Sequence, residues 1–227
     1  MRSKNDPRGR SGAGKDERKA GEPERSFIER ARRAQIVTAA VETIAELGFA
    51  KASLARIAER AGISKGVISY HFAGKGELIE RVVEEVYGEI GAFVGGRLDD
   101  RSGATTWLRV YIESVAEYML GHRTQLIALG EIFHHFRTDD GAPRYGVASR
   151  EPLYVRLENA FLDGQRSGEL RPFDVRVMAV TLQAGIDDMF AYWSAYPEHD
   201  LAAHARELAG LFQRATRAES TPTEEQQ

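Results

Sequence analysis

Apolar residues recur at helical spacing along nearly all of this 227-residue chain, and this pattern restricts its fold more than any other feature. Ile36, Ala40, Ile44 and Leu47 are separated by four, four and three residues, which places them on one face of a helix. No stretch shows the sustained period-two alternation, rich in β-branched residues, that predicts a strand. No repeat occurs at a fixed period. The sequence therefore predicts an all-α fold of about nine or ten helices.

Residues that begin and end helices divide the first hundred positions into segments. The expected helices cover residues 26–47, 54–61, 65–71 and 75–94. Gly48 follows the first, where a left-handed C-cap is expected, and Gly62 can supply the positive φ of the turn between the second and third. Ser53 and Ser64 precede the second and third helices as N-caps. Later stripes predict helices near residues 107–119, 126–136, 153–168, 178–193 and 201–212, with a turn-rich loop over 138–149.

Charge is unevenly distributed along the chain. Lys and Arg outnumber Asp and Glu by 16 to 9 in residues 1–75, a net charge of +7, whereas the remaining 152 residues carry 15 against 25, a net charge of −10. A basic segment can bind a polyanion by releasing its counterions, and an acidic remainder is repelled by phosphates. The overall charge of −3 is therefore compatible with a nucleic-acid partner.

The two ends of the chain have too few apolar residues to fold. Residues 1–25 are rich in Gly and charged side chains, so we expect a disordered basic arm, which could extend along a DNA duplex. Residues 219–227 are polar, and we expect a flexible tail. Between them, the expected domains are residues 26–75 and residues 76–218.

Residues 53–75 carry the most specific signal. Two short helices joined by a tight turn that contains glycine are typical of a helix-turn-helix, whose second helix enters the major groove of DNA. Ile57 and Ala58 supply small apolar contacts between the two helices. Gly66 lowers helix stability by about 1 kcal/mol relative to alanine. A glycine on an exposed recognition face fits a close approach to the duplex.

Over residues 27–80 the sequence resembles the DNA-binding domain of the TetR family of bacterial transcriptional regulators. The resemblance rests on the pattern G-x4-S-x3-I-A-x2-A-G-I-S-K-G-x-I-S-Y-H-F-x-x-K-x-x-L, from Gly48 to Leu78. The family usually has Tyr at the position of Ser69, so the contact made there differs in this chain. The resemblance implies base contacts from Gly66, Val67 and Ser69, and contacts to the DNA backbone from Ser53, Lys65, Tyr70, His71 and Lys75, with Ser64 at the start of the recognition helix.

The remaining helices hold both Trp residues and most of the Tyr and Phe residues, which is more aromatic mass than a spacer needs. Ligand sites are mostly apolar, with a few polar groups that fix orientation. The resemblance implies a cavity for a medium-sized, lipophilic or partly aromatic effector, with ordinary core packing as the alternative for each residue. The candidate ligand-binding residues are Trp107, Tyr111, Tyr118, Met119, Phe133, His134, Met178, Gln183, Asp187 and Phe190.

The segment from Gly164 to Asp174 resembles the connection between the last two long helices of the family, which pair with those of a second copy as a four-helix bundle. The expected helix over residues 75–94 would then swing when the effector binds, and this movement would change the separation of the two recognition helices in the dimer. Packing in the protomer's own core is the alternative for each interface residue. The candidate interface residues are Leu153, Leu157, Phe161, Leu182, Gly185, Ile186, Met189 and Trp193.

Composition and spacing exclude several other classes of protein. The absence of Cys excludes disulfides, Cys-ligated metals and thiol nucleophiles, and no apolar run reaches the 18 residues of a membrane span. Gly9 to Lys15 matches the start of a P-loop, but Asp16 replaces the required Ser or Thr. Glu131 and His134 have the Glu-x-x-His spacing of di-iron bundles, but no second copy exists.

These observations predict a cytoplasmic, ligand-responsive TetR-type repressor that binds a palindromic double-stranded DNA operator as a homodimer. A small-molecule effector would release it, and we expect no enzymatic activity, cofactor, metal or membrane partner. A regulator of the same fold that answers to a protein partner, or that activates transcription, is the alternative; an all-α enzyme is a more remote one.

Overall fold

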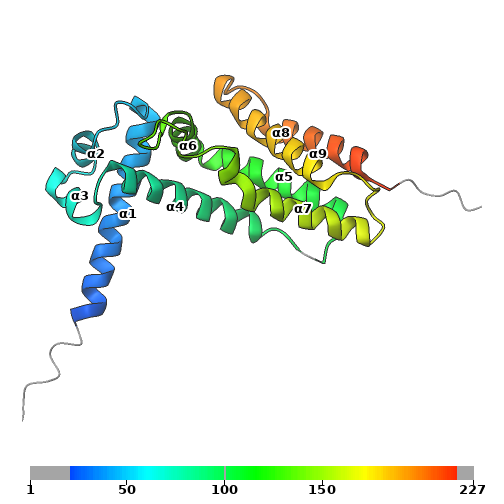
Figure 1. The fold of residues 1–227 in the computed structure, drawn as a ribbon, viewed down its shortest axis with the longest axis horizontal. Coiled ribbons are helices and arrows are strands. Elements are labelled where there is room, and N and C mark those ends of the chain that lie inside the picture. The colour runs from blue at the N-terminus through cyan, green and yellow to red at the C-terminus, as the bar shows by residue number, and fades with distance from the viewer. Residues whose placement is uncertain (1–20, 100, 219–227) are drawn as a thin grey trace, which may run out of the picture.

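The computed structural model describes residues 21–99 and 101–218 of the chain. In these two ranges the only pairing of extended residues consists of two isolated bridges, and the fold is otherwise helical, which confirms the all-α prediction. Figure 1 shows α1, α2 and α3 at one end of the molecule and α4 running from them to the remaining helices. The helices are α1 (Gly21–Leu47), α2 (Leu54–Arg60), α3 (Lys65–His71), α4 (Lys75–Gly95), α5 (Ala104–Gly121), α6 (Arg123–His135), the 3-10 helix η1 (Val147–Arg150), α7 (Glu151–Arg166), α8 (Val175–Ala195) and α9 (Leu201–Thr216).

Helix α1 is longer than predicted. It begins at Gly21, so residues 21–25, which we expected in the arm, are helical. Pro23 lies in the first turn, where a missing N–H costs no helical hydrogen bond. The other end follows the prediction: Gly48 has φ +78°, and its N–H donates to the Ile44 carbonyl at 2.9 Å. The expected arm and tail otherwise lie in residues 1–20 and 219–227, outside the described residues.

The turns around α2 and α3 follow the sequence in all but one detail. Ser53 caps α2, since its side chain accepts from the backbone N–H of Arg56 at 3.3 Å. Gly62 has φ +66°, as the turn between the helices requires. Ser64 has the extended backbone of an N-cap residue but its side chain makes no capping hydrogen bond.

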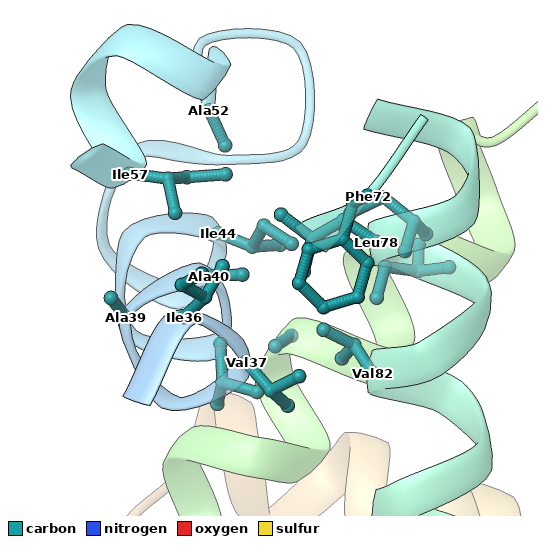
Figure 2. Close-up of a cluster of buried hydrophobic side chains, with 14 of the residues drawn as sticks. Ile36, Val37, Ala39, Ala40, Ile44, Ala52, Ile57, Phe72, Leu78 and Val82 are labelled. Atoms are coloured by element: carbon teal, nitrogen blue, oxygen red, sulfur yellow. The ribbon is translucent and has the colours of Figure 1, made fainter. Parts of the chain in front are cut away.

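A first apolar core joins the N-terminal helices to α4 and α6. Figure 2 shows Ile36 and Ile44 of α1 beside Phe72, Leu78 and Val82, all of them almost completely buried. Three residues of α6 belong to the same core: Ala128, Leu129 and Ile132. This core contains residues from both sides of the boundary predicted between residues 75 and 76. The division into two domains at that point stays a prediction. A shift of α4 or α6 is therefore felt by α1 through direct packing.

A second core lies among α5, α7, α8 and α9 and contains most of the residues that we expected at a dimer interface. Leu157, Phe161, Leu182, Ile186, Met189 and Trp193 are at most 7% exposed and pack within the protomer. Leu153 is half-buried against this core, and a Cβ added to Gly185 would lie 3.2 Å from Cδ1 of Leu208 on α9. The burial of these residues agrees with the alternative of packing in the protomer's own core, and their place in a dimer interface stays a prediction.

Candidate functional site

One face of helix α3 packs against the first core, and the opposite face is exposed to solvent. Ile68 is completely buried and packs in the first core with Ile57 and Ala58 of α2. The opposite face is open to solvent, with Tyr70 exposed over 76% of its surface. Most of the predicted DNA-binding side chains of this region are exposed, and Val67 and His71 are half-buried; the exposed ones are Ser53, Ser64, Lys65, Gly66, Ser69 and Tyr70.

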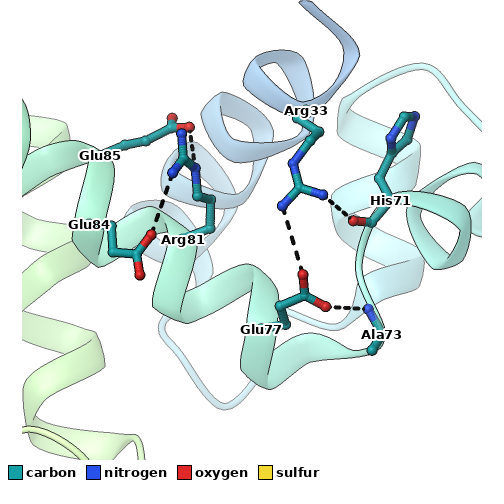
Figure 3. Close-up of polar contacts among 7 residues, drawn as sticks. All are labelled: Arg33, His71, Ala73, Glu77, Arg81, Glu84 and Glu85. Carbon is teal, nitrogen blue, oxygen red and sulfur yellow. Dashed lines mark hydrogen bonds and ion pairs between the residues drawn. The ribbon is translucent and has the colours of Figure 1, made fainter. Parts of the chain in front are cut away.

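Arg33 and Glu77 hold the end of α3 in place. Figure 3 shows the Arg33 guanidinium, which donates to the carbonyl of His71 at 2.5 Å and pairs with Glu77 at 3.7 Å. The Glu77 carboxylate also accepts from the N–H of Ala73 at 2.6 Å, which satisfies a free donor in front of α4. The recognition helix is thereby tied to both α1 and α4.

Lys75 differs from the other predicted DNA-binding residues. Its ammonium donates to the carbonyl of Phe49 at 2.7 Å and lies 4.1 Å from the centre of the Phe49 ring. Partial burial lowers the pKa of Lys75. This side chain therefore holds the turn after α1, and its contact with a phosphate stays a prediction.

Glu131 of α6 reaches the same turn from the other side. Its carboxylate accepts from the N–H of Phe49 at 3.0 Å and lies 3.8 Å from His135. In the sequence, Glu131 was notable for its Glu-x-x-His spacing with His134, a spacing that occurs in di-iron sites. In the described ranges, no three or more His, Asp or Glu side chains form a group that could hold a metal ion. The backbone of Phe49 is thus held by α4 through Lys75 and by α6 through Glu131. We call these three residues the junction.

A cavity of about 750 Å³ lies among α4, α5, α6, α7 and α8. Its wall is mostly apolar, and Glu131 and Phe133 of α6 line it. Burial raises the pKa of Tyr111 and of Tyr87 to about 12, so both phenols in the wall stay neutral near pH 7. The volume falls in the range of about 300–1,000 Å³ that is usual for small-molecule sites.

The polar part of the cavity wall centres on Asp187. Its Oδ1 accepts from Nε2 of Gln183 at 2.7 Å, and its Oδ2 lies 2.6 Å from Nη1 of Arg150. Burial raises the pKa of Asp187, and the positive charge of Arg150 opposes that effect. An ion pair of this kind adds polarity to the wall without adding net charge.

Comparison with known proteins agrees with this architecture. The profile described as "Bacterial regulatory proteins, tetR family" matches residues 36–82. The chain is 37% identical to the transcriptional regulator BetI 2 of Chromohalobacter salexigens, over 82% of this chain and 88% of that protein. It is 30% identical to the probable transcriptional regulator ArpR of Pseudomonas putida, over 73% of this chain and 81% of that protein. The chain belongs to the TetR family.

The fold of this chain is shared by solved structures. FadR from Bacillus subtilis, in complex with stearoyl-CoA, superposes with a TM-score of 0.65 and 23% identity, over 79% of this chain and 96% of that one. Together with the family profile and the two curated relatives, this fold describes a TetR-family transcriptional regulator, with an N-terminal helix-turn-helix and a larger helical C-terminal part. None of its helices in the described ranges has both the length and the apolar composition that a membrane span requires.

In this TetR-family chain the cavity collects most of the residues predicted to bind a ligand. Trp107 and Met178 lie outside it: both pack on the second core, and the Trp107 ring stacks on Tyr111 at 5.3 Å. Those that line it are Tyr111, Tyr118, Met119, Phe133, His134, Gln183, Asp187 and Phe190.

Sequence reasoning missed other parts of the wall. Arg150 lies in η1, at the end of a loop that has no periodic pattern to indicate which way a side chain points. Tyr87 belonged to a broad apolar stripe and gave no sign that it would line a cavity rather than pack. A charged residue directly after a Gly- and Pro-containing loop is the one signal that could have indicated Arg150.

Proposed function

We propose that this protein is a ligand-responsive repressor, which binds a palindromic operator as a homodimer and is released by a small lipophilic or aromatic effector. The observation that carries the proposal is the junction, because Glu131 is both a wall residue of the cavity and a hydrogen-bond partner of the turn before the helix-turn-helix. A cavity in the C-terminal part favours a small-molecule effector over a protein partner. FadR, which shares the fold, was solved with stearoyl-CoA.

DNA binding is assigned to the open face of α3. Lys65 and Tyr70 are exposed and close to the start and end of that helix, where they can reach phosphates on either side of the major groove. Gly66, Val67 and Ser69 lie between them and are assigned to the base edges. A palindromic operator matches a twofold protein whose half-sites lie about 34–36 Å apart or at a multiple of that spacing.

The homodimer is assigned to the outward faces of α7 and α8. Val155 and Leu162 of α7 and Val177 and Val180 of α8 are between 37% and 61% exposed, although all four are apolar. Two helices with such faces can pack against the same two helices of a second copy, which gives the self-complementary contact of a twofold dimer. We propose these outward-facing residues for the contact in place of the residues predicted from the sequence, most of which are buried within the protomer.

Release follows from a two-state movement. An effector that expands the cavity displaces α4 and α6, and the junction carries this displacement to the turn before α2. The two recognition helices of the dimer then no longer match the half-site spacing. The effector prefers this state, so its binding lowers the affinity for the operator.

A mobility-shift titration with the DNA upstream of the protein's own gene tests the regulatory function. We expect binding that weakens steeply with salt, since phosphate contacts dominate the affinity. Absence of binding at low salt, together with failure to enrich any sequence from a random-operator selection, would contradict the proposal.

Analytical ultracentrifugation tests the dimer separately. Val180→Glu places a charge on the proposed contact face and should shift the protein to the monomer. Leu211→Glu is the matched control, since Leu211 is 57% exposed on α9, outside that face. A dimer that survives Val180→Glu but not Leu211→Glu would move the interface to α9.

A further inference from the structure

Unpaired polar atoms gather on one side of the cavity. In the described ranges, four buried side-chain polar atoms have no hydrogen-bond partner, and three of them belong to cavity-lining residues of α8: Gln183, Asp187 and Ser194. Asp187 still has its charge compensated by Arg150 at 2.6 Å. Ser194 lies eleven residues after Gln183, about 16 Å farther along the helix at 1.5 Å per residue. Gln183 is therefore the uncharged residue whose unpaired atom lies next to the Asp187–Arg150 ion pair.

The orientation of the Gln183 amide is determined by its neighbour. Its Nε2 donates to Oδ1 of Asp187 at 2.7 Å. A flipped amide would place its oxygen against the carboxylate, with two acceptors facing each other. The Oε1 atom therefore remains an acceptor without a donor, on a residue that is only 9% exposed. Buried acceptors are almost always satisfied in folded proteins, so this one calls for a donor from outside the chain.

The charges in the wall limit what that donor can be. The charged side chains that line the cavity are Glu131, Asp187, Arg150 and Arg156, and their formal charges sum to zero. Asp187 is paired with Arg150, and Glu131 accepts from Phe49 and lies near His135. Arg156 is exposed, so its charge is hydrated by solvent. An extra charge brought into the mostly apolar space beside Gln183 would lose its hydration without gaining a buried counter-charge. The site favours a neutral head group.

We infer that the effector is an uncharged, largely apolar molecule whose hydroxyl group donates a hydrogen bond to Oε1 of Gln183. This inference rests on the proposed function, because it names the chemistry of the molecule that the cavity would bind. A hydroxyl satisfies the acceptor that the chain leaves open. The apolar remainder of the molecule fills the space between the aromatic side chains of α4, α5 and α6.

Four probes with the same hydrocarbon portion separate the possible head groups: 4-butylphenol, 4-butylanisole, 4-butylbenzoate and 4-butylbenzylamine. Binding to the full-length protein is measured by isothermal titration calorimetry, without DNA. We expect the phenol to bind at least about tenfold more tightly than the anisole, which has no donor. We expect the benzoate and the amine, which are charged at pH 7, to bind more weakly than the phenol.

A variant then assigns the preference to Gln183. Gln183→Met keeps the length of the side chain and removes the acceptor, so phenol and anisole should bind to it with equal affinity. Gln183→Leu serves the same purpose if the first variant does not fold. Gln125→Met is the matched control, because Gln125 lies on α6 and does not line the cavity; it should keep the tenfold preference.

Several outcomes would overturn the inference: equal binding of phenol and anisole to the unmodified protein, strongest binding by a charged probe, a preference that survives in Gln183→Met, or no binding by any of the four. Operator binding is measured separately by mobility shift. If the probes give one of these outcomes while the protein still binds its operator, the inference of a hydroxyl-bearing effector is wrong and the proposed regulatory function is retained. If operator binding fails, the proposed function is wrong whatever the probes do.

Discussion

Tyr70 on the recognition helix is exposed over 76% of its surface, whereas Gln183 in the cavity wall is 9% exposed and still leaves one atom unpaired. The helix-turn-helix keeps its binding groups on the outside of a dense apolar core, so they contribute little to the stability of the fold. The cavity keeps its binding groups inside the fold, where each unpaired atom lowers the free energy of unfolding by roughly 1–3 kcal/mol. Binding and stability are separable in the first region and coupled in the second.

The sharpest test of this separation is a double substitution on α3. Lys65→Ala with Tyr70→Ala should lower the affinity for the operator by about a thousandfold, because a dimer loses four contacts of about 1 kcal/mol each. The salt dependence should also become shallower, since cationic contacts with phosphates are lost. Mobility shifts over a salt series measure both effects.

The melting temperature of the same variant completes that test. It should change little, because both side chains are exposed. Arg206→Ala on α9 is a control for loss of surface charge. A large fall in melting temperature together with affinity would show that the recognition helix needs these groups to fold.

The second test concerns the buried phenol of Tyr111, which is 6% exposed. Burial raises its pKa from 10 to about 12, so the unfolded chain ionises Tyr111 at a lower pH than the folded one. Its contribution to stability is fully present below pH 10 and is lost as the pH rises to 12, by up to about 2–3 kcal/mol. Denaturant unfolding at intervals of pH measures the loss.

Tyr111→Phe should make stability less dependent on pH between 10 and 12. The variant has no group to ionise at that position, and the ring that packs against Trp107 is kept. An unchanged pH dependence would mean that Tyr111 is not desolvated, and the two regions would then be more alike than their burial indicates.

The third test concerns the junction, where the two regions meet. Glu131→Ala should lower the free energy of unfolding by about 1–2 kcal/mol, because the N–H of Phe49 loses its acceptor. Glu131→Gln keeps an acceptor oxygen and should lose less. Hydrogen exchange at the Phe49 amide should accelerate in the Ala variant and change little in the Gln variant. If the Phe49 amide exchanged at the same rate in the two variants, its hydrogen bond to residue 131 would not contribute to the coupling between the cavity and the helix-turn-helix.

The smallest expected effect is also the most discriminating. Gly66→Ala should raise the free energy of unfolding by about 0.5–1 kcal/mol, since a Cβ there would lie no closer than 3.6 Å to Oγ of Ser64 and alanine favours helix. The same methyl group would stand between α3 and the base edges, so affinity for the operator should fall. Chemical denaturation and mobility shift would then move in opposite directions. A variant that gains stability and keeps its affinity would show that the DNA does not approach this position closely.

The same contrast explains how far the sequence could be interpreted. Gly48, Gly62 and Ser53 were assigned correctly because turns and caps of fixed length demand particular residues. In the C-terminal part the sequence predicted the helices but not which of their residues face the cavity. Trp107 and Met178 pack on the second core instead of lining the cavity. Apolar side chains line both the second core and the cavity, so periodicity does not separate a cavity wall from a core.

Contacts that cross long stretches of chain were also beyond the sequence. The sequence predicted a phosphate contact for Lys75 and gave no sign that its ammonium donates to the carbonyl of Phe49, twenty-six residues away. Arg150 reaches Asp187 from a loop without periodicity. Such pairs depend on how helices are placed relative to one another, and a local pattern carries no information on that placement.

The junction has a consequence for how this regulator can diverge. Glu131 and Lys75 bond to backbone atoms of residue 49, and every amino acid except proline supplies both the N–H and the carbonyl. Mutational drift at that position can therefore alter the packing of the ring while the polar link persists. Substitutions in the cavity wall can change which molecules bind, and substitutions in the recognition helix can change which operators bind, while the hydrogen bonds of the junction are kept.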